Sequence, residues 1–187
     1  MLSVLTRKTR PARALRRTVT PTGHERYLGA DHVIVSKTDT KGRILYANRH
    51  FLDISGFRES ELLGAPHSIL RHPAMPRAAF RLMWERISTG HEFFAYVINL
   101  CREGDHYWVH AHVTPTYDSS GEIIGYHSNR RAPRREAIAA VEPLYARLVD
   151  IEQSASDRRT GMEQSTAALV ELLESRNMSY DSFIASL

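Results

Sequence analysis

Cysteine is almost absent from this sequence of 187 residues, since Cys101 is the only one. A single cysteine cannot form an internal disulfide, and such usage is typical of proteins from a reducing compartment. Long apolar runs are also missing, because no stretch approaches the roughly 20 residues that a membrane-spanning helix needs. The N-terminus lacks the continuous apolar segment of a secretion signal. These absences predict a cytoplasmic protein with no transmembrane segment.

Acidic residues are missing from the first 20 positions, where the chain carries only basic charges: Arg7, Lys8, Arg10, Arg13, Arg16 and Arg17. The net charge of the whole chain is +4, so the remainder is slightly acidic. Basic charge confined to one terminus predicts a solvated arm over residues 1–22 that can contact anionic surfaces such as lipid. Because the body of the chain is not basic, we expect no nucleic-acid partner.

Catalytic motifs are missing as well. No Ser-His-Asp spacing, phosphate-binding loop or pair of carboxylates stands out, and we therefore expect no enzymatic activity. His106, His110 and His112 share one face of a predicted strand. No carboxylate or cysteine joins these three histidines, so we expect a packed surface there and no metal site.

The segment 99–115 organises the rest of the chain. It predicts a hairpin whose turn is centred on Gly104, because glycine adopts positive φ at no steric cost. From His106 onward the side chains alternate between the two faces of a strand, with Tyr107 on one face and Trp108 on the other. A hairpin of this length can form the centre of an antiparallel sheet.

The other segments supply the remaining elements of an α+β fold. Further strands are predicted over 32–38, 43–47, 91–100 and 122–130 from β-branched runs bounded by turn residues. Helical spacing predicts short helices over 48–56 and 60–64 and a longer helix over 76–90, with a proline-rich connector over 66–75. We therefore expect a five-stranded antiparallel sheet with short helices on one face, plus a C-terminal helical extension over 133–187.

The predicted strand 91–100 is apolar on both faces, so a helix of this chain or a partner subunit should cover its second face. The segment 133–152 carries an amphipathic stripe that could do so, and Pro143 inside it is expected to kink or restart the helix. Further helices are expected over 160–177 and 178–187. The sequence leaves open whether the stripe covers this sheet or another protomer.

The order of two strands, short helices, one longer helix and three strands resembles that of a PAS domain, here over residues 23–132. The local sequence is similar to the PAS domain of the aerotaxis-receptor family over about residues 30–147. The most specific matches are the RHP–MP connector at 71–76, GDHYWV at 104–109 and AAVEPLY at 139–145. Other matching residues are Tyr46, Ala47, Asn48, Phe51, Ser55, Gly56, Phe57, Glu61, Leu62, Gly64, Pro66, His67, Ala79, Phe80, Met83, Trp84, Asn99, Pro115, Gly125 and Tyr126.

This resemblance implies that the protein binds FAD non-covalently and senses redox state or oxygen through it, with the flavin carrying the redox chemistry. The flavin-contacting residues of the family map onto Asn48, Arg71, His72, Phe80, Trp84 and Asn99. Arg71 suits the phosphates as a planar multiple donor, and the amide of Asn99 suits the polar edge of the ring. Phe80 and Trp84 are expected to form apolar walls.

The sequence departs from the family at a few positions. Ala74 follows the R-H-P motif in place of an acidic residue, Phe93 and Ala95 replace Trp and Gly, and Tyr96 replaces a smaller residue. Ala95 is predicted to share a strand face with Asn99, where its methyl group would narrow the pocket. Haem held by histidines of the connector, His67 or His72, and an empty pocket are the alternatives to FAD.

Two functions follow from these observations. The first is a free-standing cytoplasmic PAS protein of signal transduction that senses redox state or oxygen through FAD, linked to chemotaxis or motility. The second is a cofactor-free PAS adaptor that dimerises and binds signalling proteins, with Tyr96 and Trp108 as contact residues. In both cases we expect a homodimer and a signalling protein as partner.

Overall fold

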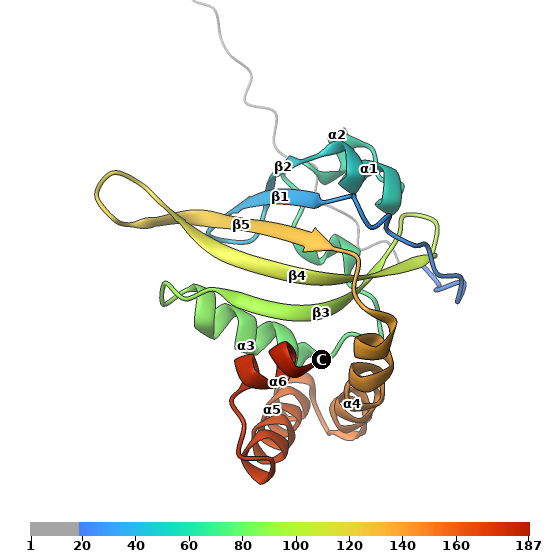
Figure 1. Cartoon of the computed structure of the whole chain (residues 1–187), viewed down its shortest axis with the longest axis vertical. Coiled ribbons are helices and arrows are strands. Elements are labelled where there is room, and N and C mark those ends of the chain that lie inside the picture. Colours follow the sequence, from blue (N-terminus) through green and yellow to red (C-terminus); the bar gives the residue numbers. More distant parts are fainter. Residues whose placement is uncertain (1–18) are drawn as a thin grey trace, which may run out of the picture.

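The computed structural model describes residues 19–187, and its centre is a five-stranded antiparallel sheet (Figure 1). The strands are β1 (Ile34–Asp39), β2 (Ile44–Ala47), β3 (Phe93–Leu100), β4 (His106–Tyr117) and β5 (Ile123–Arg131). Their order is β2-β1-β5-β4-β3, so the last strand lies between the N-terminal hairpin and the central one. The predicted α+β class with a five-stranded antiparallel sheet is confirmed. Most of the predicted basic arm lies outside the described residues.

Four short helical segments connect β2 to β3. They are α1 (Arg49–Ser55), α2 (Glu59–Leu62), the 3₁₀ helix η1 (His67–Leu70) and α3 (Arg77–Ile87). Helix α1 begins at Asn48, whose side chain accepts from the Phe51 amide, and ends at Gly56 in the left-handed conformation. Helices α1 and α2 cover one face of the sheet, where Ile34, Phe51 and Tyr107 are fully buried (Figure 1).

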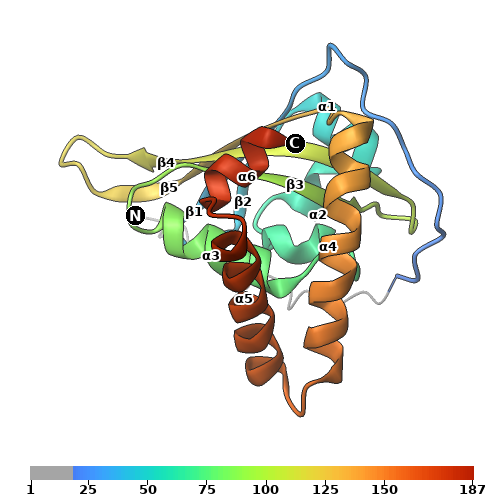
Figure 2. The ribbon, with the colours of Figure 1, turned by 60° about the horizontal axis from the view of Figure 1, so that its bottom comes forward.

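The C-terminal helices lie on the opposite face of the sheet (Figures 1 and 2). They are α4 (Arg135–Ser154), α5 (Arg158–Ser175) and α6 (Tyr180–Ser186), and α4 and α5 form an antiparallel hairpin (Figure 2). The stripe of α4 buries Val141 and Tyr145 in one cluster with Tyr96 of β3. The Tyr145 hydroxyl also donates to the Tyr96 carbonyl oxygen at 2.8 Å. This chain's own helices therefore cover the second face of β3.

Pro143 lies inside α4, which continues through it to Ser154. Of the two outcomes expected at Pro143, a kink or a restart of the helix, the restart is wrong and the kink stays a prediction. A proline removes one backbone hydrogen bond, and here buried residues on both sides of it, Val141 and Tyr145, keep the two halves of α4 packed on the sheet.

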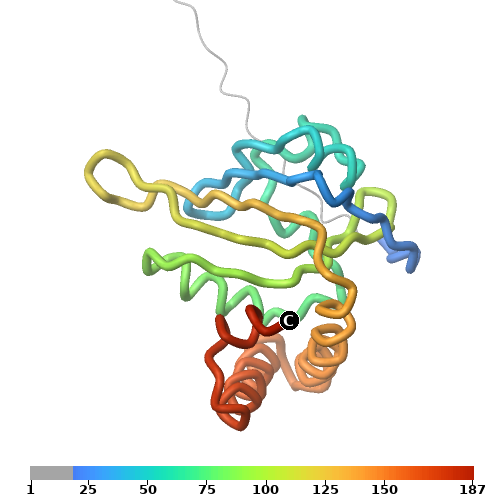
Figure 3. Tube along the Cα trace, viewed as in Figure 1, coloured from blue at the N-terminus to red at the C-terminus, as the bar shows by residue number. Residues whose placement is uncertain are grey.

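The segment before β1 is tied to the central hairpin (Figure 3). The Thr22 amide donates to the Gly104 carbonyl oxygen at 2.9 Å, and the Arg26 guanidinium binds Asp105 at 2.8 Å. A side chain at Gly104 would lie 2.5 Å from the Thr20 carbonyl oxygen, so this close approach requires glycine. Within the described part of the chain, no helix has the length and apolar character needed to cross a membrane.

Candidate functional site

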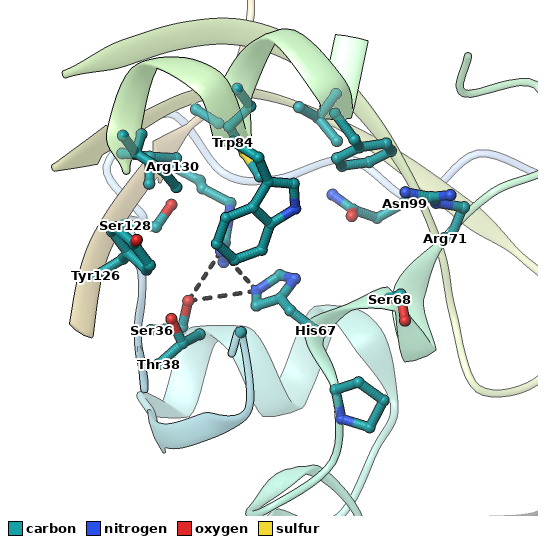
Figure 4. A pocket seen from close by; sticks show the side chains of 18 of the residues that line it. Ser36, Thr38, His67, Ser68, Arg71, Trp84, Asn99, Tyr126, Ser128 and Arg130 are labelled. Carbon is teal, nitrogen blue, oxygen red and sulfur yellow. Dashed lines mark hydrogen bonds between the residues drawn. The ribbon is translucent and has the colours of Figure 1, made fainter. Parts of the chain in front are cut away.

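A cavity of about 300 Å³ lies between the sheet and the segment that runs from η1 to α3 (Figure 4). Four strands line its floor, with Ser36, Thr38, Val97, Asn99, Ala111, Val113, Tyr126, Ser128 and Arg130. The walls come from η1 and α3, with His67, Ser68, Arg71, Phe80, Met83, Trp84 and Ile87. This volume lies at the lower end of the usual range for small-molecule sites, about 300–1,000 Å³.

Trp84 forms the outer wall of the cavity from α3, and 37% of the residue is exposed. Its indole meets the Tyr126 ring edge-on, with 5.5 Å between the ring centroids. It also contacts Gly42 in the β1–β2 turn, where a Cβ atom would lie 3.1 Å from the indole. Trp84 is therefore held between the turn and β5.

Three residues expected to contact a flavin meet at one end of this cavity. Asn99 is 6% exposed and pairs through its backbone with Arg71 in an isolated antiparallel bridge. The Arg71 guanidinium lies over the Phe80 ring, 4.2 Å from its centroid. Such a cation–π contact fixes the direction of the guanidinium as well as contributing attraction. A cation therefore lies on an aromatic ring, next to an amide. Figure 4 shows Arg71 and Asn99 side by side at this end of the cavity.

The other two expected contact residues, Asn48 and His72, are not among the residues that line the cavity. The Asn48 Oδ1 accepts from the Val35 and Phe51 amides at 3.0 and 3.2 Å, which joins β1 to α1. The His72 Nδ1 accepts from the Ala74 amide at 3.1 Å. Both side chains stabilise local backbone in this structure.

Ala95 is not itself among the residues that line the cavity, but it lies next to them. It packs with Ile87 and Tyr126, which both line the cavity, and it pairs across the strands with Ala111, a lining residue of β4. The expectation that its methyl group narrows the pocket stays a prediction.

Sequence reasoning missed the most polar part of the cavity, which is centred on Arg130. The Arg130 Nη2 atom donates to the Ser36 Oγ at 2.8 Å and to the His67 Nε2 at 2.7 Å (Figure 4). Arg130 is 6% exposed, and its Nη1 atom is buried with no hydrogen-bond partner among the described residues. Alternation along β5 was the available signal, because Tyr126, Ser128 and Arg130 share the inward face.

The Arg130 cluster carries a positive charge without a counter-ion. In the described part of the chain, no carboxylate lies within ion-pair distance of Arg130. Burial lowers the pKa of Arg130 to about 10, so the guanidinium stays charged at neutral pH. Burial and the Arg130 charge lower the pKa of His67 to about 3. His67 is therefore neutral and accepts from Arg130, since arginine has only donors.

This geometry also bears on the haem alternative. The Nε2 atom of His67 is already occupied by the guanidinium at 2.7 Å, and an iron there would meet a cation. His72 does not line the cavity, as described above. Neither histidine therefore presents a nitrogen atom to the cavity that is ready to bind an iron.

Comparisons with known proteins agree with this fold. The family model for the PAS fold matches residues 30–128, just over half of the chain. The aerotaxis receptor of Escherichia coli (strain K12) is 44% identical over 121 residues, which are 65% of this chain and 24% of the receptor. The biofilm dispersion protein BdlA of Pseudomonas aeruginosa is 34% identical over 87 residues, which are 46% of this chain and 21% of that protein. The chain thus spans about a quarter or less of these relatives.

Among solved structures, the dark structure of the blue-light photoreceptor Aureochrome1 LOV is similar with a TM-score of 0.52. It is 24% identical in sequence, and the match covers 64% of this chain and 83% of that one. At this level of identity the likeness concerns the fold alone.

Proposed function

The chain belongs to the PAS family, and from this premise we propose that it is a sensory protein of signal transduction whose cavity binds the ring system of FAD. The observation that carries the proposal is the lining of the cavity, which includes Arg71, Phe80, Trp84 and Asn99. The relative with 44% identity is named an aerotaxis receptor, which supports redox or oxygen as the stimulus and chemotaxis or motility as the process.

The residues of the cavity fit a flavin in shape and in polarity. A volume of about 300 Å³ suits a ring system but not a whole dinucleotide, so the rest of FAD would extend outside the cavity. Phe80 and Trp84 offer aromatic faces to a planar ring. Asn99 and Arg130 offer donors to its carbonyl oxygens. When bound, the flavin would supply the redox chemistry, and the chain would supply the walls and hydrogen bonds.

The first test is the visible absorption spectrum of the purified protein, followed by heat release of any chromophore and by titration with FAD. A flavin spectrum with FAD in the supernatant is the expected result. A protein that stays colourless after incubation with FAD would overturn the cofactor assignment and favour the cofactor-free adaptor. A haem spectrum would overturn it as well.

A double variant tests the site itself. Arg71→Ala with Trp84→Ala should lower the bound flavin at least tenfold, because it removes a cation and an aromatic wall from the cavity. Arg49→Ala with Leu63→Ala is the matched control, since both residues are exposed and neither lines the cavity. Equal flavin content in the two double variants would contradict the assignment.

We also propose a cytoplasmic location, a homodimer and a signalling protein as partner. The adaptor function rested partly on Tyr96 and Trp108 as contact residues, and both are buried under this chain's own helix α4. The flavin sensor is therefore the better supported of the two functions. Light scattering over a range of protein concentrations tests the dimer, which a constant monomer mass would exclude.

A further inference from the structure

Helix α3 lines the cavity with one face and packs on the C-terminal helices with the other. One face lines the cavity with Phe80, Met83, Trp84 and Ile87. The other face contacts α4 and α5, where Ala79 joins the buried cluster that contains Leu169 and Leu173 of α5. A shift of α3 in response to a ligand would therefore change its contacts with the C-terminal helices directly, with no change in the sheet required.

The N-terminus of α3 lacks a cap from its own segment. Its N-cap residue is Pro76, which provides no side-chain hydrogen bond, and no acidic residue lies in the first turn. A helix start leaves four amide groups without intrahelical partners and carries a partial positive charge. An acceptor for these amides must come from elsewhere.

Glu152, near the C-terminal end of α4, supplies that acceptor. Its Oε1 atom accepts from the Ala78 amide at 3.0 Å, and its Oε2 atom lies 3.9 Å from the Arg77 guanidinium. Glu152 is 7% exposed, so this carboxylate is buried against the start of α3. Burial strengthens such a contact, because a buried charge without its partners is costly.

The first turn of α5 holds Glu152 in place. A Cβ atom at Gly161 would lie 2.6 Å from the Glu152 carbonyl oxygen, so the two backbones cross closely there. The other end of α3 is tied to α6 through Arg86 and Asp181 at 2.8 Å. Both side chains of that pair are exposed, so the ion pair contributes little to stability. Glu152 therefore provides the stronger connection between α3 and the C-terminal helices.

We propose that Glu152 couples the occupancy of the cavity to the α4–α5 hairpin by capping the N-terminus of α3. A ligand that moves the cavity face of α3 changes the position of the Ala78 amide and with it the capping contact. Linkage makes the effect reciprocal, so loosening α4 and α5 changes the affinity of the cavity for its ligand. This inference rests on the cavity binding a ligand, as proposed above, but does not require that ligand to be a flavin.

The first experiment is hydrogen exchange on the ligand-free protein. Glu152→Ala removes the acceptor, and the amides of the first turn of α3 should exchange about tenfold faster. Glu152→Gln keeps the size of the side chain and one acceptor oxygen, so it should raise the exchange rate less than Glu152→Ala. It also replaces the alanine variant in the experiment if that variant does not fold. Glu142→Gln is the matched control, because Glu142 is an exposed acid on the same helix. Unchanged exchange in both Glu152 variants would overturn the proposal.

The second experiment tests the coupling and separates it from the flavin assignment. Val97 lines the cavity, so Val97→Phe places a ring inside it whether or not a flavin binds. Both Val97→Phe and added FAD should change the exchange of α4 and α5, and Glu152→Gln should reduce that change several-fold. A response only to Val97→Phe would uphold the coupling and reject the flavin. Equal responses with and without Glu152→Gln would reject the coupling and point to the Tyr145–Tyr96 contact as the route.

Discussion

Replacing Arg130 by methionine is expected to stabilise the cofactor-free protein and to weaken flavin binding. Arg130 is buried without a carboxylate partner, and its Nη1 atom has no hydrogen-bond partner among the described residues. Replacing a buried charge with an apolar side chain of similar volume removes the cost of taking that charge out of water. The same charge is the group that would attract an electron-rich ligand, so stability and binding should change in opposite directions.

The magnitude follows from the pKa of Arg130, which burial lowers to about 10. Since one pKa unit corresponds to about 1.4 kcal/mol, the burial cost is roughly 3 kcal/mol. The variant also loses the hydrogen bonds to Ser36 and His67, worth about 1 kcal/mol each. The net expected gain in the free energy of unfolding is therefore about 1 kcal/mol. It should be constant from about pH 7.5 to 9, because Arg130 keeps its proton in both states there and His67 is largely neutral in both states.

Urea unfolding of the cofactor-free protein measures this gain, and a thermal scan should show a midpoint about 2–4 °C higher. Arg131→Met is the matched control, since Arg131 is the next residue of β5 and is exposed. The control should change neither stability nor affinity, whereas Arg130→Met should weaken FAD binding at least tenfold. A loss of more than about 1 kcal/mol in Arg130→Met would refute the reasoning, because the cation would then be net stabilising.

Three further predictions concern stability. The pKa of His67 falls to about 3 on folding, so the unfolded state binds more protons below about pH 6.5. The free energy of unfolding, measured in urea, should therefore fall by roughly 2 kcal/mol between pH 7 and pH 5. The fall should be smaller in His67→Asn. Gly42 has φ 73° and lies against Trp84, so Gly42→Ala should lower the free energy of unfolding by about 1 kcal/mol or more. An unchanged urea midpoint would contradict this. Tyr145→Phe leaves the Tyr96 carbonyl oxygen without its hydroxyl donor and should cost about 1 kcal/mol, measured as the shift in urea midpoint.

The sequence was sufficient for most of the fold because local rules decide it. Alternation and glycine turns placed the strands, and the helical spacing of residues 76–90 placed α3. The helix does not restart at Pro143, because tertiary packing keeps it continuous where the local rule allows an interruption. The sequence could not decide which element covers the second face of β3. An amphipathic stripe has the same pattern whether it packs on the sheet of its own chain or on another chain.

The site was harder to predict because its parts come from distant segments. Arg71, Phe80, Trp84 and Asn99 were found through family resemblance and do line the cavity. The Arg130 cluster joins side chains that are 94 and 63 residues apart in sequence. The pairing of β1 with β5 brings Ser36 to Arg130, and the bridge between Arg43 and Pro66 places His67 beside them. Alternation along β5 could place Arg130 on the inward face, but periodicity gives neither the neighbour nor the register of a strand, so it could not show that Ser36 and His67 meet Arg130.

The position of α4, α5 and α6 after the strands that they cover has a consequence for biosynthesis. The apolar outer face of β3 and β4 leaves the ribosome before these helices, because residues 133–187 are made after residues 93–117. At about 5–20 residues per second, this interval lasts roughly 3 to 11 s. During that time Tyr96, Ile98 and Trp108 are exposed to other nascent chains. The protein should therefore depend on chaperones during translation more strongly than during refolding of a chain that already contains these helices.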